Sequence, residues 1–274
     1  MRRGVGIAAV VIGLLALATA VLSVTGGVGS FMHPGPFFAS GPLVRGERSI
    51  PLTAGTVVSV NAAAARVTVQ NGPAGRLGVQ YDLPRGSFFL HQSGAGVSLG
   101  DAGGSFNLGM LTGTPTLTVT VPSGTVLSVT SAAGPITVRG TYSTLTLNAT
   151  AGTVALEQVS TSSLRATTEA GPFSASFVSA PRRVSVQDAA GSILVNGPWA
   201  WNESLHDTAG SITVNGRPVV RTKVSVTVSA GQLNSAVAGL GSGGNGTFTG
   251  TVGSGSGSGR LTITAAAGSV TLNP

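Results

Sequence analysis

The sequence predicts an all-β fold, in which the chain winds into a flattened β-solenoid of about 19 residues per rung. The first observation is a glycine that recurs eight times, at intervals of 18 to 21 residues and in a similar local pattern. The second is an apolar residue two positions after each of these glycines, as a stack of near-identical rungs requires. The repeat glycines are Gly134, Gly152, Gly171, Gly191, Gly210, Gly231, Gly250 and Gly268.

Each rung is predicted to hold two strands joined by a small turn at the glycine. Before the glycine, apolar residues such as Val184 and Val186 alternate with polar ones, and this period of two indicates a strand with one buried face. A second strand, such as 212–214, follows the glycine, and it ends at Asn-Gly pairs that recur at 196–197 and 215–216. We expect the turn glycine to have a positive φ or to approach the neighbouring rung closely.

Composition excludes several classes of protein. The 42 glycines and the low content of charged residues, 8%, fit a stack with a Thr/Ser surface, and the patterned Val, Ile, Leu and Thr argue against general disorder. Cysteine is absent, which excludes disulfides, a thiolate nucleophile and a Cys-ligated zinc site. The net charge is +7, but the aromatic residues that a nucleic-acid module intersperses among its basic residues are missing, so we expect no nucleic acid as partner.

The remaining basic residues form modest clusters at Arg182-Arg183 and within 217–223. Outside a cell, such clusters would face anionic wall polymers or lipid headgroups. The sequence therefore predicts an anionic envelope polymer or a membrane protein as the partner.

The N-terminal segment 1–24 is predicted to be a signal anchor. Arg2 and Arg3 precede residues 4–24, which carry no charge and are long enough to cross a bilayer as a helix. This charge distribution predicts a single-pass protein of the cell membrane, with its N-terminus in the cytoplasm and the remainder extracytoplasmic. A signal peptide cleaved after Ala20, which would release a secreted protein, is the alternative. The Gly- and Pro-containing segment 25–45 is predicted to be an extended tether.

Two β-rich regions are expected after the tether. Residues 46–122 are less regular and predict either early rungs or a cap, and residues 123–274 hold the clear repeats. Within these, the Gly/Ser-rich run 238–259 predicts a weak rung. The chain stops at 270–274, in step with an earlier rung and with no sequence left for a cap, so we expect this C-terminal rung either to pack on a partner or to self-associate.

The best candidate site is a column of acidic residues. Glu169, Asp188 and Asp207 are spaced 19 and 19 residues apart, which would place them along one edge of three successive rungs. Stacked carboxylates repel unless they are neutralised, so the column predicts a contact with a cation or a basic partner. The alternative is that the aspartates accept backbone N–H bonds as Asx turns, with Arg165 or Arg183 as the counter-charge.

The two tryptophans are the second candidate. Trp199 and Trp201 stand at a corner of the rung, where exposed rings would form a contact site for a sugar or a protein. Packed over the rung that contains Glu203, they would instead be a lateral plug. His206 has no second imidazole in register, and the eight acidic residues are scattered over the chain. The sequence thus predicts no enzyme, no catalytic residue, no cofactor and no metal.

A resemblance to a known family rests on residues 120–129 and their continuation into 133–138, where an apolar alternation surrounds the turn glycine. These residues resemble the putative adhesin family of bacterial envelope proteins, a β-strand-repeat domain of unknown function. The resemblance implies a transmembrane segment followed by a β-solenoid, and it supplies no catalytic residue. Some members are associated with envelope-stress systems.

Together these observations predict a non-enzymatic, membrane-tethered extracytoplasmic β-solenoid that acts at the cell surface as an adhesin or a cell-envelope binding scaffold. The alternative is an accessory or sensory subunit of an envelope-stress signalling system. Because the predicted cytoplasmic stub has only three residues, this alternative requires another membrane protein as partner.

Overall fold

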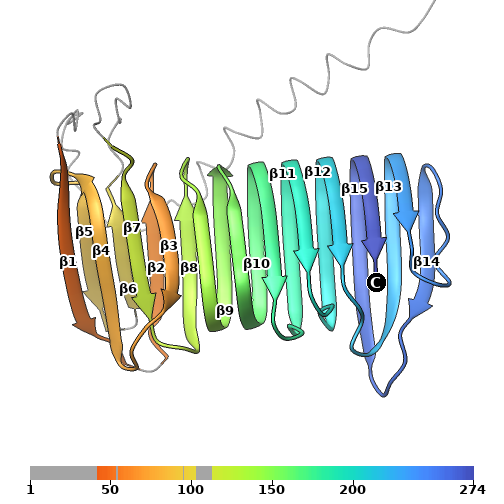
Figure 1. The fold of residues 1–274 in the computed structure, drawn as a ribbon, viewed down its shortest axis with the longest axis horizontal. Coiled ribbons are helices and arrows are strands. Elements are labelled where there is room, and N and C mark those ends of the chain that lie inside the picture. Colours follow the sequence, from red (N-terminus) through yellow and green to blue (C-terminus); the bar gives the residue numbers. More distant parts are fainter. Residues whose placement is uncertain (1–41, 54, 95, 103–112) are drawn as a thin grey trace, which may run out of the picture. The chain divides into compact units, whose positions relative to one another are not determined.

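The computed structural model describes residues 42–53, 55–94, 96–102 and 113–274, and these residues form an all-β structure (Figure 1). All of the described residues belong to one compact unit, Phe37–Pro274. The predicted membrane segment 4–24, the cleavage site after Ala20 and most of the tether lie outside the described residues. Within the described part of the chain, no helix has both the length and the apolar character needed to span a membrane.

The described residues form strands that join in one hydrogen-bonded sheet. The strands are β1 (Leu43–Pro51), β2 (Val57–Ala62), β3 (Arg66–Asn71), β4 (Arg76–Pro84), β5 (Phe88–Ser93), β6 (Gly96–Asp101), β7 (Thr116–Val121), β8 (Thr125–Ser131), β9 (Ile136–Ala151), β10 (Val154–Phe177), β11 (Arg183–Asn196), β12 (Asn202–Asn215), β13 (Arg221–Ser235), β14 (Gly246–Val252) and β15 (Ser258–Asn273).

From β9 onward the strands stack in parallel. β10 pairs with β9 and β11, β11 pairs with β12, and β15 pairs with β12 and β13. β10 to β13 and β15 each contain one repeat glycine, and alternate side chains on both sides of that glycine are buried in one core. The prediction of an all-β fold is confirmed for this part of the chain.

Apolar side chains at equivalent positions of successive strands form continuous inward columns. In β10 to β13 and β15, the column that lies two residues after the repeat glycine is at most 1% exposed at each position. Its members Phe173, Ile193, Ile212, Val270 and Leu233 are paired in register. The period-two pattern of the sequence therefore identifies the buried face correctly.

The repeat glycines of β10 to β13 and β15 also stack, because each lies against the carbonyl group of the repeat glycine in the neighbouring rung. A Cβ on Gly210 would lie 1.8 Å from the carbonyl oxygen of Gly191, and a Cβ on Gly268 would lie 1.5 Å from that of Gly210. Gly171 and Gly268 also have a positive φ, of 116° and 139°, whereas Gly191 and Gly210 do not. Close approach between neighbouring strands is thus the common reason for glycine at these turns.

The C-terminal rung is not the open end of the stack, so the prediction that the stack ends there is wrong. β15 lies between β12 and β13 and pairs with both (Figure 1). Its side chains match β12 closely. The Asn273 side-chain amide donates to Asn215 Oδ1 over 2.9 Å, and that of Asn215 donates to Asn196 Oδ1 over 2.8 Å. Both edges of β15 are occupied, and self-association through it would require that one of these pairings open.

The Gly/Ser-rich segment 238–259 does not form a rung, which corrects the second prediction for this end. β14 pairs antiparallel with β13 at the end of the strand order, and Gly250 pairs with Val224 rather than joining the glycine column. Val237 and Leu240, in the connection before β14, are buried against the core. The segment therefore covers the end of the stack and then returns the chain to β15.

The N-terminal region 46–122 contains both structures that the sequence left open. β2 and β3 continue the stack in parallel with β8 and β9, and β6 and β7 pair in parallel with β2 and β3. β4 pairs antiparallel with β7, β5 pairs antiparallel with β6, and β1 pairs antiparallel with β4. β1 begins at Leu43, so the predicted tether, 25–45, ends earlier than expected. Antiparallel strands thus cover both ends of the parallel stack.

Candidate functional site

The structure brings together two of the three residues in the predicted acidic column. Asp188 and Asp207 are partners in register on β11 and β12, and both side chains face inward, with exposures of 2% and 1%. The partner of Asp188 on β10 is Thr168, and Glu169 next to it is exposed. Glu169 is therefore out of the column by one residue and lies on the opposite face of its strand.

The two aspartates sit over the turn glycines, which leave room for their carboxylates. Asp207 Oδ1 accepts a hydrogen bond from the Ala209 amide over 3.1 Å, the Asx-type bond that the sequence analysis offered as the alternative. Asp207 Oδ2 is buried without a partner, and so are both carboxylate oxygens of Asp188. A Cβ on Gly191 would lie 2.6 Å from Asp188 Oδ2, and one on Gly210 would lie 2.8 Å from Asp207 Oδ2.

Burial favours the neutral form of both carboxyl groups. Burial, followed by the charge of Asp188, raises the pKa of Asp207 to about 6. Burial also raises the pKa of Asp188, against a smaller opposing effect from the Thr168 hydroxyl and nearby backbone amides. Among the described residues, neither aspartate forms an ion pair with a basic side chain. Because both carboxyl groups face the core, they are not accessible to a large partner in solution.

The two tryptophan side chains differ in their exposure to solvent. Trp199 is 1% exposed and belongs to the core, as the plug hypothesis requires. Trp201 is 44% exposed, as a contact site requires. Its backbone is fixed on both sides, because its amide donates to the Pro181 carbonyl over 3.0 Å and its carbonyl accepts from the Arg260 amide over 2.8 Å. The backbone that carries the exposed indole is therefore held between Pro181 and β15.

Glu203 lies next to the buried tryptophan and is itself 3% exposed. It occupies an inward column between Val184 on β11 and Leu261 on β15. Glu203 Oε2 accepts a hydrogen bond from the Ala200 amide over 3.2 Å, whereas Glu203 Oε1 and Trp199 Nε1 have no hydrogen-bond partner. Burial raises the pKa of Glu203 to about 7. The group is thus a buried acid within an apolar column and is inaccessible to substrate.

A row of exposed basic and polar residues crosses the outer face of the same strands. The sequence places Arg183 and Lys223 in two separate basic clusters, but it does not indicate that Asn202 and Arg260 join them into one row. Arg183 on β11 pairs with Asn202 on β12, Asn202 pairs with Arg260 on β15, and Arg260 pairs with Lys223 on β13. All four residues are exposed. Arg260 is far from the others in sequence, and it joins the row only because β15 inserts between β12 and β13. We call these four residues the basic row.

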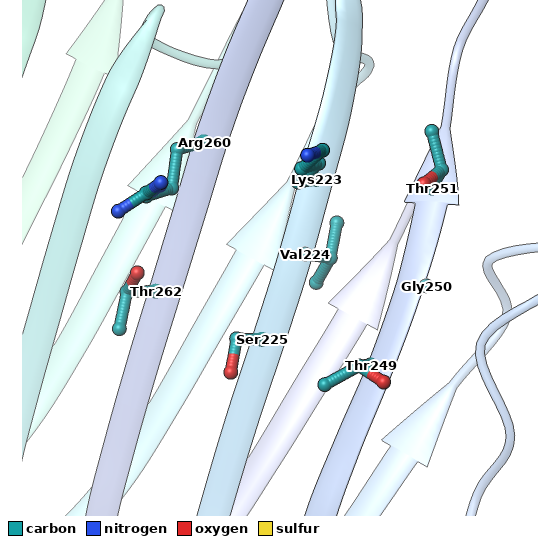
Figure 2. Close-up of a pocket in the computed structure, with 8 residues that line it drawn as sticks. All are labelled: Lys223, Val224, Ser225, Thr249, Gly250, Thr251, Arg260 and Thr262. Carbon is teal, nitrogen blue, oxygen red and sulfur yellow. The ribbon is translucent and has the colours of Figure 1, made fainter.

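Three adjoining hollows follow the basic row. The first, of about 620 Å³, is lined by Arg182, Arg183, Trp201 and Asn202, among others. The second, of about 270 Å³, shares Arg183 and Asn202 with the first and also includes Arg260. The third is about 520 Å³ in volume. Figure 2 shows Arg260 and Lys223 at the same level of neighbouring strands in this third hollow, which extends to Thr249 and Thr251 on β14.

Because neighbouring hollows share their lining residues, they form one shallow groove from β10 to β14. A further hollow, of about 480 Å³, lies at β1, β4 and β7 and differs in its charge. Its Arg45 is 3.6 Å from Asp82 in an ion pair, and Glu47 also lines it. In the groove the one lining carboxylate is that of Glu203, which is turned into the core. The groove is therefore the more strongly cationic surface. In the described residues, no cluster of three His, Cys, Asp or Glu side chains could hold a metal ion.

Comparison with known proteins places the chain beside structures of adhesin-like proteins. No family model and no curated protein matches the sequence. A putative cell adhesion protein from Clostridium sporogenes matches with a TM-score of 0.38 and 11% identity, over 84% of this chain and 99% of that chain. A putative adhesin from Bacteroides fragilis matches with a TM-score of 0.37 and 13% identity, over 84% of this chain and 97% of that chain.

A putative adhesin from Parabacteroides merdae matches with a TM-score of 0.33 and 9% identity, over 84% of this chain and 96% of that chain. The names of these structures agree with the family that the sequence resembles. At these TM-scores the likeness says nothing about ligand or mechanism.

Proposed function

We propose that the chain is a non-enzymatic, membrane-tethered β-solenoid that binds material of the bacterial cell envelope, as an adhesin or a surface scaffold does. The observation that carries the proposal is the outer face of the parallel stack, where the strands present hydroxyl groups and a basic row in register. Such a face is extended and regular, as contact with a long polymer requires. The burial of alternate side chains in one core, on both sides of the repeat glycine, supports the solenoid architecture.

The placement of the acidic residues supports a binding role over a catalytic one. Acid–base chemistry needs carboxyl groups that reach the substrate. Asp188, Asp207 and Glu203 are instead turned into the core, with exposures of 3% or less. The one histidine on these strands, His206, is exposed and stands beside a buried carboxylate.

The membrane tether rests on the sequence of residues 4–24 and on the two arginines that precede them. With this orientation, the unit Phe37–Pro274 would lie on the outer side of the membrane. Alkaline extraction of membranes that contain the full chain tests the tether. A retained anchor keeps the protein in the pellet, whereas cleavage after Ala20 releases a shorter protein into the medium.

Cosedimentation of the purified full chain with isolated bacterial envelopes tests the binding role. We expect saturable binding that weakens as the ionic strength rises, because the contact is between opposite charges at an exposed surface. Failure of the protein to bind any envelope fraction would refute the proposal. A stoichiometric membrane protein recovered with the full chain from native membranes would favour the accessory-subunit alternative.

A further inference from the structure

We infer that the groove along the basic row binds a linear glycan that carries carboxylate or phosphate groups, with the glycan chain running across the strands from β10 to β14. This inference rests on the proposed envelope-binding function and specifies its ligand and its site. The first support is continuity. The three hollows share lining residues, so one extended chain can pass through all of them.

The second support is the spacing and sign of the charges. Neighbouring strands in a sheet lie about 4.8 Å apart, so partners in register present their side chains at regular intervals along the groove. Arg183, Arg260 and Lys223 are exposed members of this row, with Asn202 between Arg183 and Arg260, and Arg182 lines the hollow at its β10 end. A polymer with repeating anionic groups meets several of these cations at once, which raises the affinity above that of a single contact.

The third support is the polar and aromatic lining beside the charges. A second row of partners in register lies two residues further along the strands of the basic row and continues onto β14. It consists of Ser185, Ser204, Thr262, Ser225 and Thr249. Their hydroxyl groups can both donate and accept hydrogen bonds, as the hydroxyl groups of a sugar do. Trp201 adds an exposed ring at one end, and its backbone is fixed by two hydrogen bonds. Flat aromatic faces of this kind pack well against sugar rings.

The shape and composition of the groove argue against a bilayer or a nucleic acid as its occupant. A bilayer surface would favour a cluster of protruding apolar groups. Among the exposed large apolar residues of the described chain, Trp201 is the one that lines the groove. A single-stranded nucleic acid would favour several stacking aromatic rings, and the groove offers one. A hydroxyl-rich, cationic groove fits an anionic glycan best.

The direct test measures binding of the full chain to polygalacturonate, a linear uronate polymer, with dextran as the neutral polymer. We expect binding to polygalacturonate that weakens at least about 10-fold between low and high salt, because the contacts are exposed. We expect no binding to dextran. The combined variant Arg183→Gln, Lys223→Gln and Arg260→Gln should weaken binding about 10-fold or more, since each exposed charge contact contributes a factor of up to about five.

A matched control separates the groove from net charge. The combined variant Arg48→Gln, Arg66→Gln and Arg85→Gln removes the same charge from exposed positions outside the groove. We expect its affinity to stay within about 2-fold of that of the wild type. Trp201→Ala should weaken binding about 3-fold or more without lowering the melting temperature, because the ring is 44% exposed. Trp201→Phe should recover part of the loss.

Several results would overturn the inference. These are equal loss of binding in the two charge variants, unchanged binding in the groove variant, and failure of the wild type to bind polygalacturonate. Tighter binding to phosphatidylglycerol vesicles or to single-stranded DNA would overturn it as well. If the wild type and the groove variant bind isolated envelopes equally well, the groove is not the site, but the envelope-binding function remains. Failure of the wild type to bind envelopes refutes both.

Discussion

Replacement of Glu203 by glutamine should stabilise the protein at neutral and alkaline pH and leave its stability at pH 4 unchanged. The carboxyl group is 3% exposed, lies between Val184 and Leu261, and has one hydrogen bond, from the Ala200 amide. Burial raises its pKa from 4.5 to about 7. In the pH range between these two values, the folded protein binds more protons at this site than the unfolded chain does, so stability falls as the pH rises.

The size of the effect follows from that shift. At about 1.4 kcal/mol per pH unit, the ionised carboxylate costs about 3 kcal/mol of folding free energy above pH 7, and it costs nothing well below pH 4.5. Glutamine has the shape of the protonated acid and keeps an acceptor for the Ala200 amide. We therefore expect Glu203→Gln to be more stable than the wild type by about 3 kcal/mol at pH 8 and by about 0 at pH 4.

Urea unfolding of the full chain in a mild non-ionic detergent, followed by tryptophan fluorescence and circular dichroism from pH 4 to pH 8, measures this difference. Because burial also raises the pKa of Asp207, the wild-type curve contains a second contribution, and the informative quantity is wild type minus variant at each pH. Glu47→Gln, at an exposed position, is the control and should change stability by less than about 0.5 kcal/mol at every pH. A constant difference between wild type and Glu203→Gln across this pH range would refute the reasoning.

Three further changes test the stack itself by the same unfolding assay. Gly210→Ala should destabilise the protein by about 3 kcal/mol or more, because its Cβ would lie 1.8 Å from a neighbouring carbonyl oxygen, whereas Gly241→Ala, with nothing within 4 Å, should be near neutral. Asp207→Asn should stabilise the protein at pH 8 and not at pH 4, since it keeps an acceptor for the Ala209 amide and removes a charge that burial disfavours; equal effects at both pH values would contradict this. Asn215→Ala should lower the free energy of unfolding by about 1 to 2 kcal/mol, because it breaks two side-chain hydrogen bonds, to Asn196 and from Asn273. An equal loss of stability in the exposed control Asn234→Ala would show that these hydrogen bonds do not contribute.

The periodic parts of the fold could be predicted from the sequence because the physical constraint repeats. Each rung needs an inward apolar residue and a glycine without a Cβ, and both recur at positions such as Gly210 and Ile212. Gly250 also falls at a suitable interval and is followed by Val252, but it lies in the antiparallel strand β14. Spacing alone could not separate this edge strand from a rung, because alternation and glycine occur in both.

The prediction that Glu169 belongs to the acidic column was wrong by one residue, and the sequence contains the reason. Glu169 stands two residues before Gly171, whereas Asp188 stands three residues before Gly191. The rung between these glycines has 20 residues, so a spacing of 19 does not keep a side chain in the same column. Thr168 is the residue in register, and Glu169 faces outward. Counting from the glycine, and not from one acidic residue to the next, would have given the correct face.

The insertion of β15 connects the end of the stack with the candidate site. The sequence match between 211–215 and 269–273 was interpreted as one more rung in chain order, although it also identifies β12 as the neighbour of β15. Without the insertion, Arg260 would not lie between Asn202 and Lys223, and the basic row would lack its central arginine. The same strand that completes the hydrogen bonding of β12 and β13 therefore completes the groove.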